Sequence, residues 1–283
     1  MIIVKKASEL RKIISIKRTG AALAGFVPTM GALHKGHISL LDVSKNKTDF
    51  TVCSIFVNPA QFNNKEDFDN YPSTLENDIQ LLENNGCDIL FLPSADEIYP
   101  SKEYAQRKFD LGYLDTVLEG KFRPGHFQGV CNAVYRLLSL VNPDSLFLGQ
   151  KDFQQCLVIK KMLQLENLEK SVRVFICPTI REANGLAMSS RNMLLSSNEI
   201  KKAGAIFQSL QMIKKNLRSG DLSALKEKAK AVLAQNDLKT DYIEIADTDN
   251  LQILESWDGN KKLVALAAAY MNKVRLIDNM LLN

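Results

Sequence analysis

Up to about residue 178 the chain alternates short apolar runs with stretches in which apolar residues recur at helical spacing. The apolar runs predict strands at residues 22–27, 50–57, 88–92, 145–148 and 172–177. The helical spacing predicts helices at residues 36–46, 73–85, 130–141 and 152–165. Strands that are apolar on both faces and alternate with helices are typical of an α/β fold with a doubly wound, Rossmann-like parallel sheet. In such folds ligands bind beyond the carboxyl ends of the strands, near the point where the strand order reverses.

The pattern changes after residue 195. Residues 196–217 and 222–234 have the spacing of two charged amphipathic helices, and residues 242–246, 263–270 and 274–277 that of strands. This part predicts a smaller α+β C-terminal domain. The expected division is a first domain of residues 1–178 and a second of residues 179–283.

Composition and charge narrow the classes of protein. The chain is 46% hydrophobic and 24% charged, as globular proteins are, and its net charge of +4 suits anionic small molecules without requiring nucleic acid. Five scattered cysteines without a Cys-x-x-Cys pair indicate free thiols in a reducing cytosol. The N-terminal apolar run is too short for a secretory signal, and the late run at residues 263–271 is shorter than the roughly 20 residues of a membrane helix. We therefore expect a cytoplasmic protein without a membrane partner.

The most informative stretch is residues 28–37, which follows the first predicted strand and contains two of the chain's three histidines, His34 and His37. A helix N-terminus offers N–H groups and a positive dipole end to phosphate, and imidazoles would add further donors. Gly31 and Gly36 allow a ligand to approach the backbone closely. Their spacing matches a Walker A loop, but His37 and Ile38 replace the required lysine and hydroxyl. The alternative is a capping turn that carries two surface histidines.

Further polar clusters lie at or beyond strand ends. Gln61 follows the strand at residues 50–57 and is suited to a polar substrate, although a solvated proline turn explains it equally well. Arg123 and His126 precede a helix, where they indicate either an anion contact or a surface turn. Lys151 and Asp152 join a strand end to a helix start, as a phosphate contact or as a cap alone.

The last cluster is a loop with two hydroxyls and a guanidinium in succession, Ser189, Ser190 and Arg191, which suits polyphosphate or the capping of the next helix. Asp78, inside a predicted amphipathic helix, has the position of a solvated residue. Phosphate donors at several strand ends, with no pair of catalytic carboxylates, favour nucleotide binding and phosphoryl or nucleotidyl transfer.

Five runs, in the same order, resemble the pantothenate synthetase (pantoate–β-alanine ligase) family: residues 28–37, 54–62, 119–130, 149–155 and 185–192. The element His34-x-Gly36-His37 also resembles the HxGH signature of the nucleotidyltransferase superfamily that includes class I aminoacyl-tRNA synthetases. The resemblance implies an AMP-forming, ATP-dependent ligase that activates pantoate as pantoyl adenylate, releases pyrophosphate and transfers the acyl group to β-alanine, giving pantothenate. It also implies Mg²⁺ on the ATP phosphates, a homodimer, and a C-terminal domain that acts as a lid and excludes water from the adenylate.

The resemblance assigns roles to individual residues. It gives contacts with the ATP phosphates, and catalysis, to His34, His37, Lys151, Ser189, Ser190 and Arg191. Further ATP-binding positions are Met30, Gly36, Gly149, Asp152 and Met188. Pantoate is assigned to Gln61 and Gln155, with Met30 as a further contact, and magnesium is assigned to Asp78. Asn77 and Asn184 depart from the pattern, because acidic residues are expected there, and both changes remove negative charge near the expected metal.

Two other functions remain open at this point. A nucleotidyltransferase that acts on another small acid would share the phosphate contacts but differ in its acid pocket. A non-catalytic nucleotide sensor or RNA-binding relative of the synthetases would need a basic surface, which the mild charge and the absence of basic runs disfavour.

Overall fold

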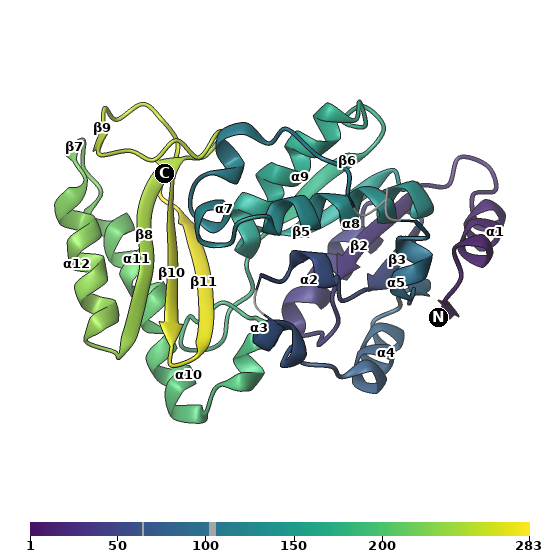
Figure 1. Cartoon of the computed structure of the whole chain (residues 1–283), viewed down its shortest axis with the longest axis horizontal. Coiled ribbons are helices and arrows are strands. Elements are labelled where there is room, and N and C mark those ends of the chain that lie inside the picture. Colours follow the sequence, from purple (N-terminus) through teal and green to yellow (C-terminus); the bar gives the residue numbers. More distant parts are fainter. Residues whose placement is uncertain (64, 102–105) are drawn as a thin grey trace. The chain divides into compact units, whose positions relative to one another are not determined.

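The computed structural model describes residues 1–63, 65–101 and 106–283, which divide into two compact units (Figure 1). One unit comprises residues 1–149 and 155–178, and the other residues 150–154 and 179–283. Residues 150–154, which the sequence pattern assigns to the first domain, therefore group with the second unit. The cause is long-range hydrogen bonding, since the carbonyls of Gln150 and Lys151 accept from Asn279 near the end of the chain.

The first unit is built on a six-stranded sheet in the order β1-β4-β3-β2-β5-β6, in which every neighbouring pair is parallel. Its strands are β1 (Ile2–Val4), β2 (Ala24–Thr29), β3 (Phe50–Ile55), β4 (Ile89–Phe91), β5 (Ser145–Gly149) and β6 (Arg173–Cys177). The predicted parallel sheet is confirmed, with β1 as an additional strand. The strand order reverses between β2 and β5, so the residues after β2 and β5 lie where such a sheet binds ligands.

Helices cover both faces of this sheet. Alternate residues of a strand point to opposite faces, and they contribute to two separate cores. Phe26 and Val52 belong to a core shared with α1 (Ala7–Lys17), α8 (His126–Val141) and α9 (Phe153–Leu165). Their neighbours Val27 and Cys53 belong to a second core, shared with α2 (Lys35–Lys45) and α4 (Leu75–Asn84). This two-sided burial explains why the strands are apolar throughout.

Short helices complete the unit, and several bounds differ from prediction. Among the described residues, the remaining elements are α3 (Lys65–Asp69), α5 (Ala95–Ile98), α7 (Glu119–Phe122) and the 3₁₀ helices η1 (Pro59–Gln61) and η2 (Gly112–Asp115). The periodicity did not predict α1. Helix α8 begins at His126 rather than at residue 130, directly after Gly125 in the left-handed conformation (φ +80°).

The second unit packs helices against an antiparallel sheet in the order β11-β10-β8. The sheet consists of β8 (Leu238–Asp247), β10 (Leu263–Met271) and β11 (Val274–Leu281). Its helices are α10 (Ser197–Ala203), α11 (Ala205–Asn216) and α12 (Ser223–Ala234), with the 3₁₀ helices η3 (Gln150–Asp152) and η4 (Ser190–Leu194). A small pair, β7 (Gly220–Asp221) with β9 (Ser256–Trp257), lies outside this sheet. The α+β character predicted for this part is confirmed.

The prediction of one helix over residues 196–217 is wrong, because α10 and α11 meet at Gly204. A Cβ at Gly204 would lie 2.9 Å from the side-chain nitrogen of Asn184. That amide donates to the carbonyl of Ile200 at 2.7 Å, near the end of α10. A side chain from outside the helix thus occupies the space at the break, which helical periodicity cannot indicate.

In the described part of the chain, no helix is long and apolar enough to cross a membrane.

Candidate active site

The connection from β2 to α2 carries the HxGH element and has an unusual backbone. Gly31 (φ +81°) and Ala32 (φ +49°) both adopt the left-handed conformation, which is uncommon for a non-glycine residue such as Ala32. A Cβ at Gly31 would approach both Asp78 and Ile55 to 3.1 Å. The turn is therefore narrow, and it depends on glycine at its first position.

Asp78 from α4 holds this turn in place. One carboxylate oxygen accepts from the N–H of Ala32 at 2.9 Å, and the other from the N–H of Leu33 at 2.8 Å and the hydroxyl of Thr74 at 3.0 Å. The side chain is buried, with 2% of the residue exposed. The expectation that Asp78 is a solvated residue of an amphipathic helix is therefore wrong. Its carboxylate stabilises the left-handed turn that leads into His34.

His34 and His37 cap the helix that follows. His34 is the N-cap of α2, and its Nδ1 accepts from the N–H of Gly36 at 3.1 Å. In return, Nδ1 of His37 accepts from the N–H of His34 at 3.2 Å, and the two rings lie 4.1 Å apart. A ring nitrogen that accepts carries no proton, so each neutral imidazole holds its proton on Nε2. The capping turn considered for this stretch is thus present, and it also determines the tautomer of both histidines.

Met30 and Gln61, the two residues assigned to pantoate in this region, contact each other through the amide nitrogen of Gln61 and the sulfur of Met30. Gln61 lies in η1, which Asn58 caps; the Asn58 amide also donates to the carbonyl of Gly129 at 3.0 Å. Helix α8 lies so close to η1 that a Cβ at Gly129 would be 2.3 Å from the carbonyl oxygen of Ala60. The residue after β2 and the loop after β3 thus lie in contact in the first unit.

The third histidine positions Gln61. Nδ1 of His126 lies 2.7 Å from the backbone oxygen of Gln61, and the Arg123 guanidinium donates to the same oxygen at 3.3 Å. The sequence allowed either an anion contact or a surface turn for Arg123 and His126. In the structure the pair supports the backbone of Gln61, a candidate substrate-binding residue. Gln155 is half-buried on α9 and belongs to the same unit.

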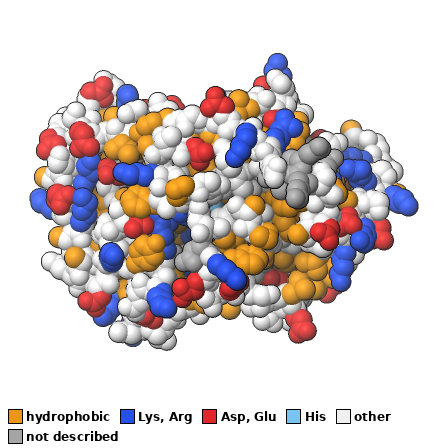
Figure 2. All heavy atoms as spheres, in the orientation of Figure 1, with side chains coloured by type: hydrophobic (Ala, Val, Ile, Leu, Met, Phe, Trp, Pro, Cys, Tyr) orange, Lys and Arg blue, Asp and Glu red, His pale blue; other side chains and the backbone are white. Residues whose placement is uncertain are grey.

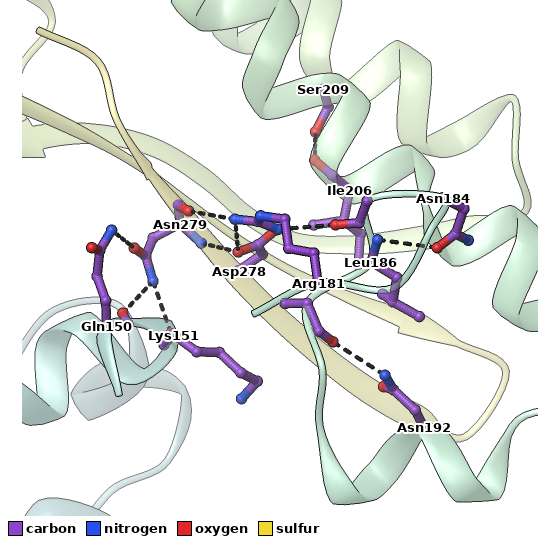
Figure 3. Close-up of polar contacts among 12 residues, drawn as sticks. Gln150, Lys151, Arg181, Asn184, Leu186, Asn192, Ile206, Ser209, Asp278 and Asn279 are labelled. Atoms are coloured by element: carbon purple, nitrogen blue, oxygen red, sulfur yellow. Dashed lines mark hydrogen bonds and ion pairs between the residues drawn. The ribbon is translucent and has the colours of Figure 1, made fainter. Parts of the chain in front are cut away.

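Gly149 ends β5 in the first unit, and the remaining candidate residues belong to the second unit. Lys151 lies in η3, with its ammonium 3.3 Å from a carboxylate oxygen of Asp152. Asn279 donates to the backbone on both sides of Lys151, next to the ion pair of Arg181 and Asp278 (Figure 3). Sequence reasoning missed these three partners, because no local motif marks them and Asn279 is 128 positions from Lys151.

The loop after Met188 leads into η4. Ser189 is the N-cap of η4, and its hydroxyl accepts from the N–H of Arg191 at 3.3 Å. Asn192 fixes the same loop, because its amide donates to the carbonyl of Ala187 at 3.1 Å. Ser190 is buried, while Ser189 and Arg191 are half-buried. The loop does not cap the helix near residue 196, because Ser196 is the N-cap of α10; Ser189 caps η4 instead.

The carboxylates of the described residues do not form a metal centre. Among those residues, no three His, Cys, Asp or Glu side chains are grouped closely enough to hold an ion. Both oxygens of Asp78 already accept hydrogen bonds. Asn184, at a position where an acidic residue was expected, donates to Ile200 and accepts from the N–H of Leu186 at 3.2 Å, so its amide has two structural partners. The described residues therefore show no cluster of three ligands, and the assignment of magnesium to Asp78 stays a prediction.

Comparison with known proteins identifies the family. The model of the family described as pantoate-beta-alanine ligase matches residues 2–281. The chain belongs to this family. The chain is also similar to a pantothenate synthetase of Caldicellulosiruptor bescii, with 43% identity over 99% of this chain and 98% of the relative. The family and the ligase activity that the sequence predicts are thereby confirmed.

Solved structures agree over the whole chain. A pantothenate synthetase from Thermus thermophilus aligns with a TM-score of 0.89 at 36% identity, covering 100% of this chain and 99% of the other. A pantoate-beta-alanine ligase from Francisella tularensis, complexed with Beta-gamma ATP and Beta-alanine, aligns with a TM-score of 0.81 at 36% identity, covering 99% and 97%. The predicted fold class, a Rossmann-like sheet domain with a smaller α+β domain, is confirmed.

Proposed function

We propose that this chain makes pantothenate in two half-reactions driven by ATP. In the first, a carboxylate oxygen of pantoate bonds to the α-phosphorus of ATP, and the bond from that phosphorus to pyrophosphate breaks. In the second, the amine of β-alanine bonds to the acyl carbon of pantoyl adenylate, loses a proton and displaces AMP. The family match and the relative complexed with Beta-gamma ATP and Beta-alanine support this course.

His34 and His37 serve in this proposal as hydrogen-bond donors to the ATP phosphates. The observation that carries it is the reciprocal cap, which leaves the proton of each neutral imidazole on Nε2. The N–H of Gly36 is already bonded to His34, so the imidazoles are better placed than that N–H to meet the nucleotide. Loss of one well-placed donor costs roughly 2.7–4 kcal/mol of transition-state stabilisation, against roughly 0.3–1 kcal/mol for an interaction with a helix end.

The other roles follow the resemblance. We assign the ATP phosphates also to Lys151, Ser189, Ser190 and Arg191, and pantoate to Gln61 and Gln155. Met30 supports the pantoate assignment through its contact with Gln61. Gly149, Asp152 and Met188 remain proposed ATP contacts, and the lid function of the second unit also remains a proposal.

Magnesium enters the proposal only with the nucleotide. Mg²⁺ in such enzymes keeps several waters and is bound by substrate phosphates with one or two carboxylates. A cation on Asp78 would compete with the hydrogen bonds that its oxygens accept from the N–H groups of Ala32 and Leu33. We therefore propose that the ion is held by the phosphates of ATP, and we assign no step of the reaction to it.

The decisive experiment is exchange of labelled pyrophosphate into ATP. Exchange should require pantoate but not β-alanine, since pyrophosphate leaves in the first half-reaction. Exchange that depends on β-alanine, or that only another acid supports, would contradict the proposal.

Two substitutions in the same assay test the histidines. His34→Ala and His37→Ala should each lower the exchange rate by about 100-fold or more, because each removes an Nε2 donor. Loss of the cap should lower the free energy of unfolding by only about 1 kcal/mol. Lys35→Ala, an exposed residue between them, is the matched control and should leave the rate within about twofold. Variants that unfold while their specific activity is unchanged would show that the histidines are caps alone.

Partners and location remain proposals as well. We propose a homodimer, which light scattering after size exclusion would detect as twice the mass of one chain. We propose no nucleic-acid partner: Figure 2 shows acidic and basic side chains intermixed over the second unit, at the left of that view. Tight tRNA binding with a steep salt dependence would contradict this.

All five cysteines are free, which supports a reducing, cytoplasmic location.

A further inference from the structure

Asn279, a residue of β11, uses its whole side-chain amide on the segment that carries Lys151. Its nitrogen donates to the carbonyl of Gln150 and to the carbonyl of Lys151, both at 2.8 Å (Figure 3). Its oxygen accepts from the side-chain amide of Gln150 at 3.3 Å. Asn279 is 2% exposed, so these bonds are shielded from water. An asparagine is suited to this position, because it offers two donors and an acceptor on one short side chain.

The two carbonyls determine the direction in which the Lys151 side chain extends from its Cα. The carbonyl of Gln150 belongs to the peptide unit before the Cα of Lys151, and the carbonyl of Lys151 belongs to the unit after it. When both units are held by one rigid group, the direction of the Cα–Cβ bond between them is set. Asn279 therefore determines where the lysine side chain starts, although it does not contact the ammonium.

Asn279 is itself held firmly. Its N–H donates to a carboxylate oxygen of Asp278 at 2.7 Å, and its carbonyl accepts from the Arg181 guanidinium at 3.3 Å. Arg181 binds both oxygens of Asp278, at 2.5 and 3.0 Å, and also donates to the carbonyl of Gly185. The guanidinium lies 4.4 Å from the centre of the Phe207 ring.

The charge of this network is balanced inside the unit. Burial raises the pKa of Asp278, and the Arg181 guanidinium opposes that rise. A buried carboxylate paired in two places with a guanidinium is a stiff support, because Asp278 without Arg181 would be an unpaired buried charge.

We propose that Asn279 is a positioning residue for Lys151 in the ligase reaction. It holds the lysine backbone so that the ammonium meets the ATP phosphates in the transition state. The inference rests on the proposed role of Lys151. The position of Lys151, a proposed phosphate contact, would then depend on β11, a strand in which no motif indicates chemistry.

The test is a double-mutant cycle in the pyrophosphate exchange assay. Lys151→Ala should lower kcat/KM for ATP by more than about 100-fold. Asn279→Ala should lower it by about 10- to 100-fold, because a lysine displaced by an ångström loses most of its effect. The double variant should be no worse than Lys151→Ala alone, since Asn279 acts through the lysine.

Two variants separate positioning from general stability. Leu276→Ala removes a buried side chain from the same strand, so it should lower the melting temperature without changing KM for ATP. If Asn279→Ala does not fold, Asn279→Ser replaces it, because the shorter side chain stays polar but cannot reach both carbonyls.

The outcomes separate the role of Asn279 from that of Lys151. Additive losses in the double variant, or unchanged exchange in a folded Asn279 variant, would overturn the positioning role while leaving the role of Lys151 intact. Unchanged exchange in Lys151→Ala would refute the proposed role of the lysine and, with it, this inference.

Discussion

At the scale of single residues, the candidate site depends on side chains that fix the backbone around other side chains. Asp78 holds the left-handed turn before His34, and Asn279 holds both peptide units of Lys151. His126 and Arg123 do the same for Gln61. The groups proposed to meet substrate are thus supported by buried or half-buried polar partners, as preorganised catalysis requires.

Substitution of Asp78 by asparagine tests this view of the turn. Asp78→Asn places an amide group against two backbone N–H donors and removes the charge that strengthens those bonds. We expect the free energy of unfolding to fall by about 3 kcal/mol and the exchange rate to fall with it. The Mg²⁺ concentration for half-maximal activity should stay unchanged. Chemical denaturation and a magnesium titration measure the two effects.

The matched control is Glu76→Gln, which removes an equal charge from an exposed position on the same helix, α4. It should change stability by less than about 0.5 kcal/mol. A large rise in the Mg²⁺ requirement of the Asp78 variant would instead identify this carboxylate as a metal ligand.

At the scale of elements, the close packing of α8 against η1 sets the position of Gln61. Gly129 allows this approach, because a Cβ there would lie 2.6 Å from the carbonyl carbon of Ala60 and 2.9 Å from the Cα of Gln61. All of these atoms belong to the backbone, so no flexible side chain can yield. Glycine is therefore required at position 129 by the packing of α8 against η1 and not by the geometry of the helix.

Gly129→Ala should displace η1 and, with it, Gln61. We expect KM for pantoate to rise by about 10-fold and stability to fall by about 1–3 kcal/mol, as is common when a close-packed contact is overfilled. KM for ATP should change less. Steady-state kinetics with each substrate varied in turn would show the difference. Ser139→Ala, exposed on the same helix, serves as control, and an unchanged KM for pantoate in the glycine variant would mean that Gln61 does not bind this substrate.

At the scale of the whole molecule, the five cysteines are distributed through the core of the first unit, and all are buried and free. Burial raises the pKa of Cys87 to about 11 and that of Cys131 to about 12. The thiolate is the reactive form. Burial therefore lowers the reactivity in two ways, because it keeps reagents away from the sulfur and keeps the thiol protonated.

We therefore expect the native protein to resist a thiol reagent such as Ellman's reagent at pH 8, and the unfolded protein to react at all five positions. The raised pKa values also imply a pH dependence. Native thiols keep their protons where unfolded ones lose them, so the stabilisation present below pH 9 should be lost as the pH rises towards 11. Rapid labelling of the native protein would show that a thiol is accessible.

The sequence by itself determined the class of fold, the family and most of the candidate residues. Strands buried on both faces are apolar throughout, and the motifs at strand ends are contiguous, so short-range patterns were enough. Tertiary structure decided the rest, because the deciding contacts join distant residues. Asp78 reaches Ala32 across 46 positions, and Asn279 reaches Lys151 across 128. No local periodicity records such a pair, which is why Asp78 was expected to be solvated and why Asn279 was missed.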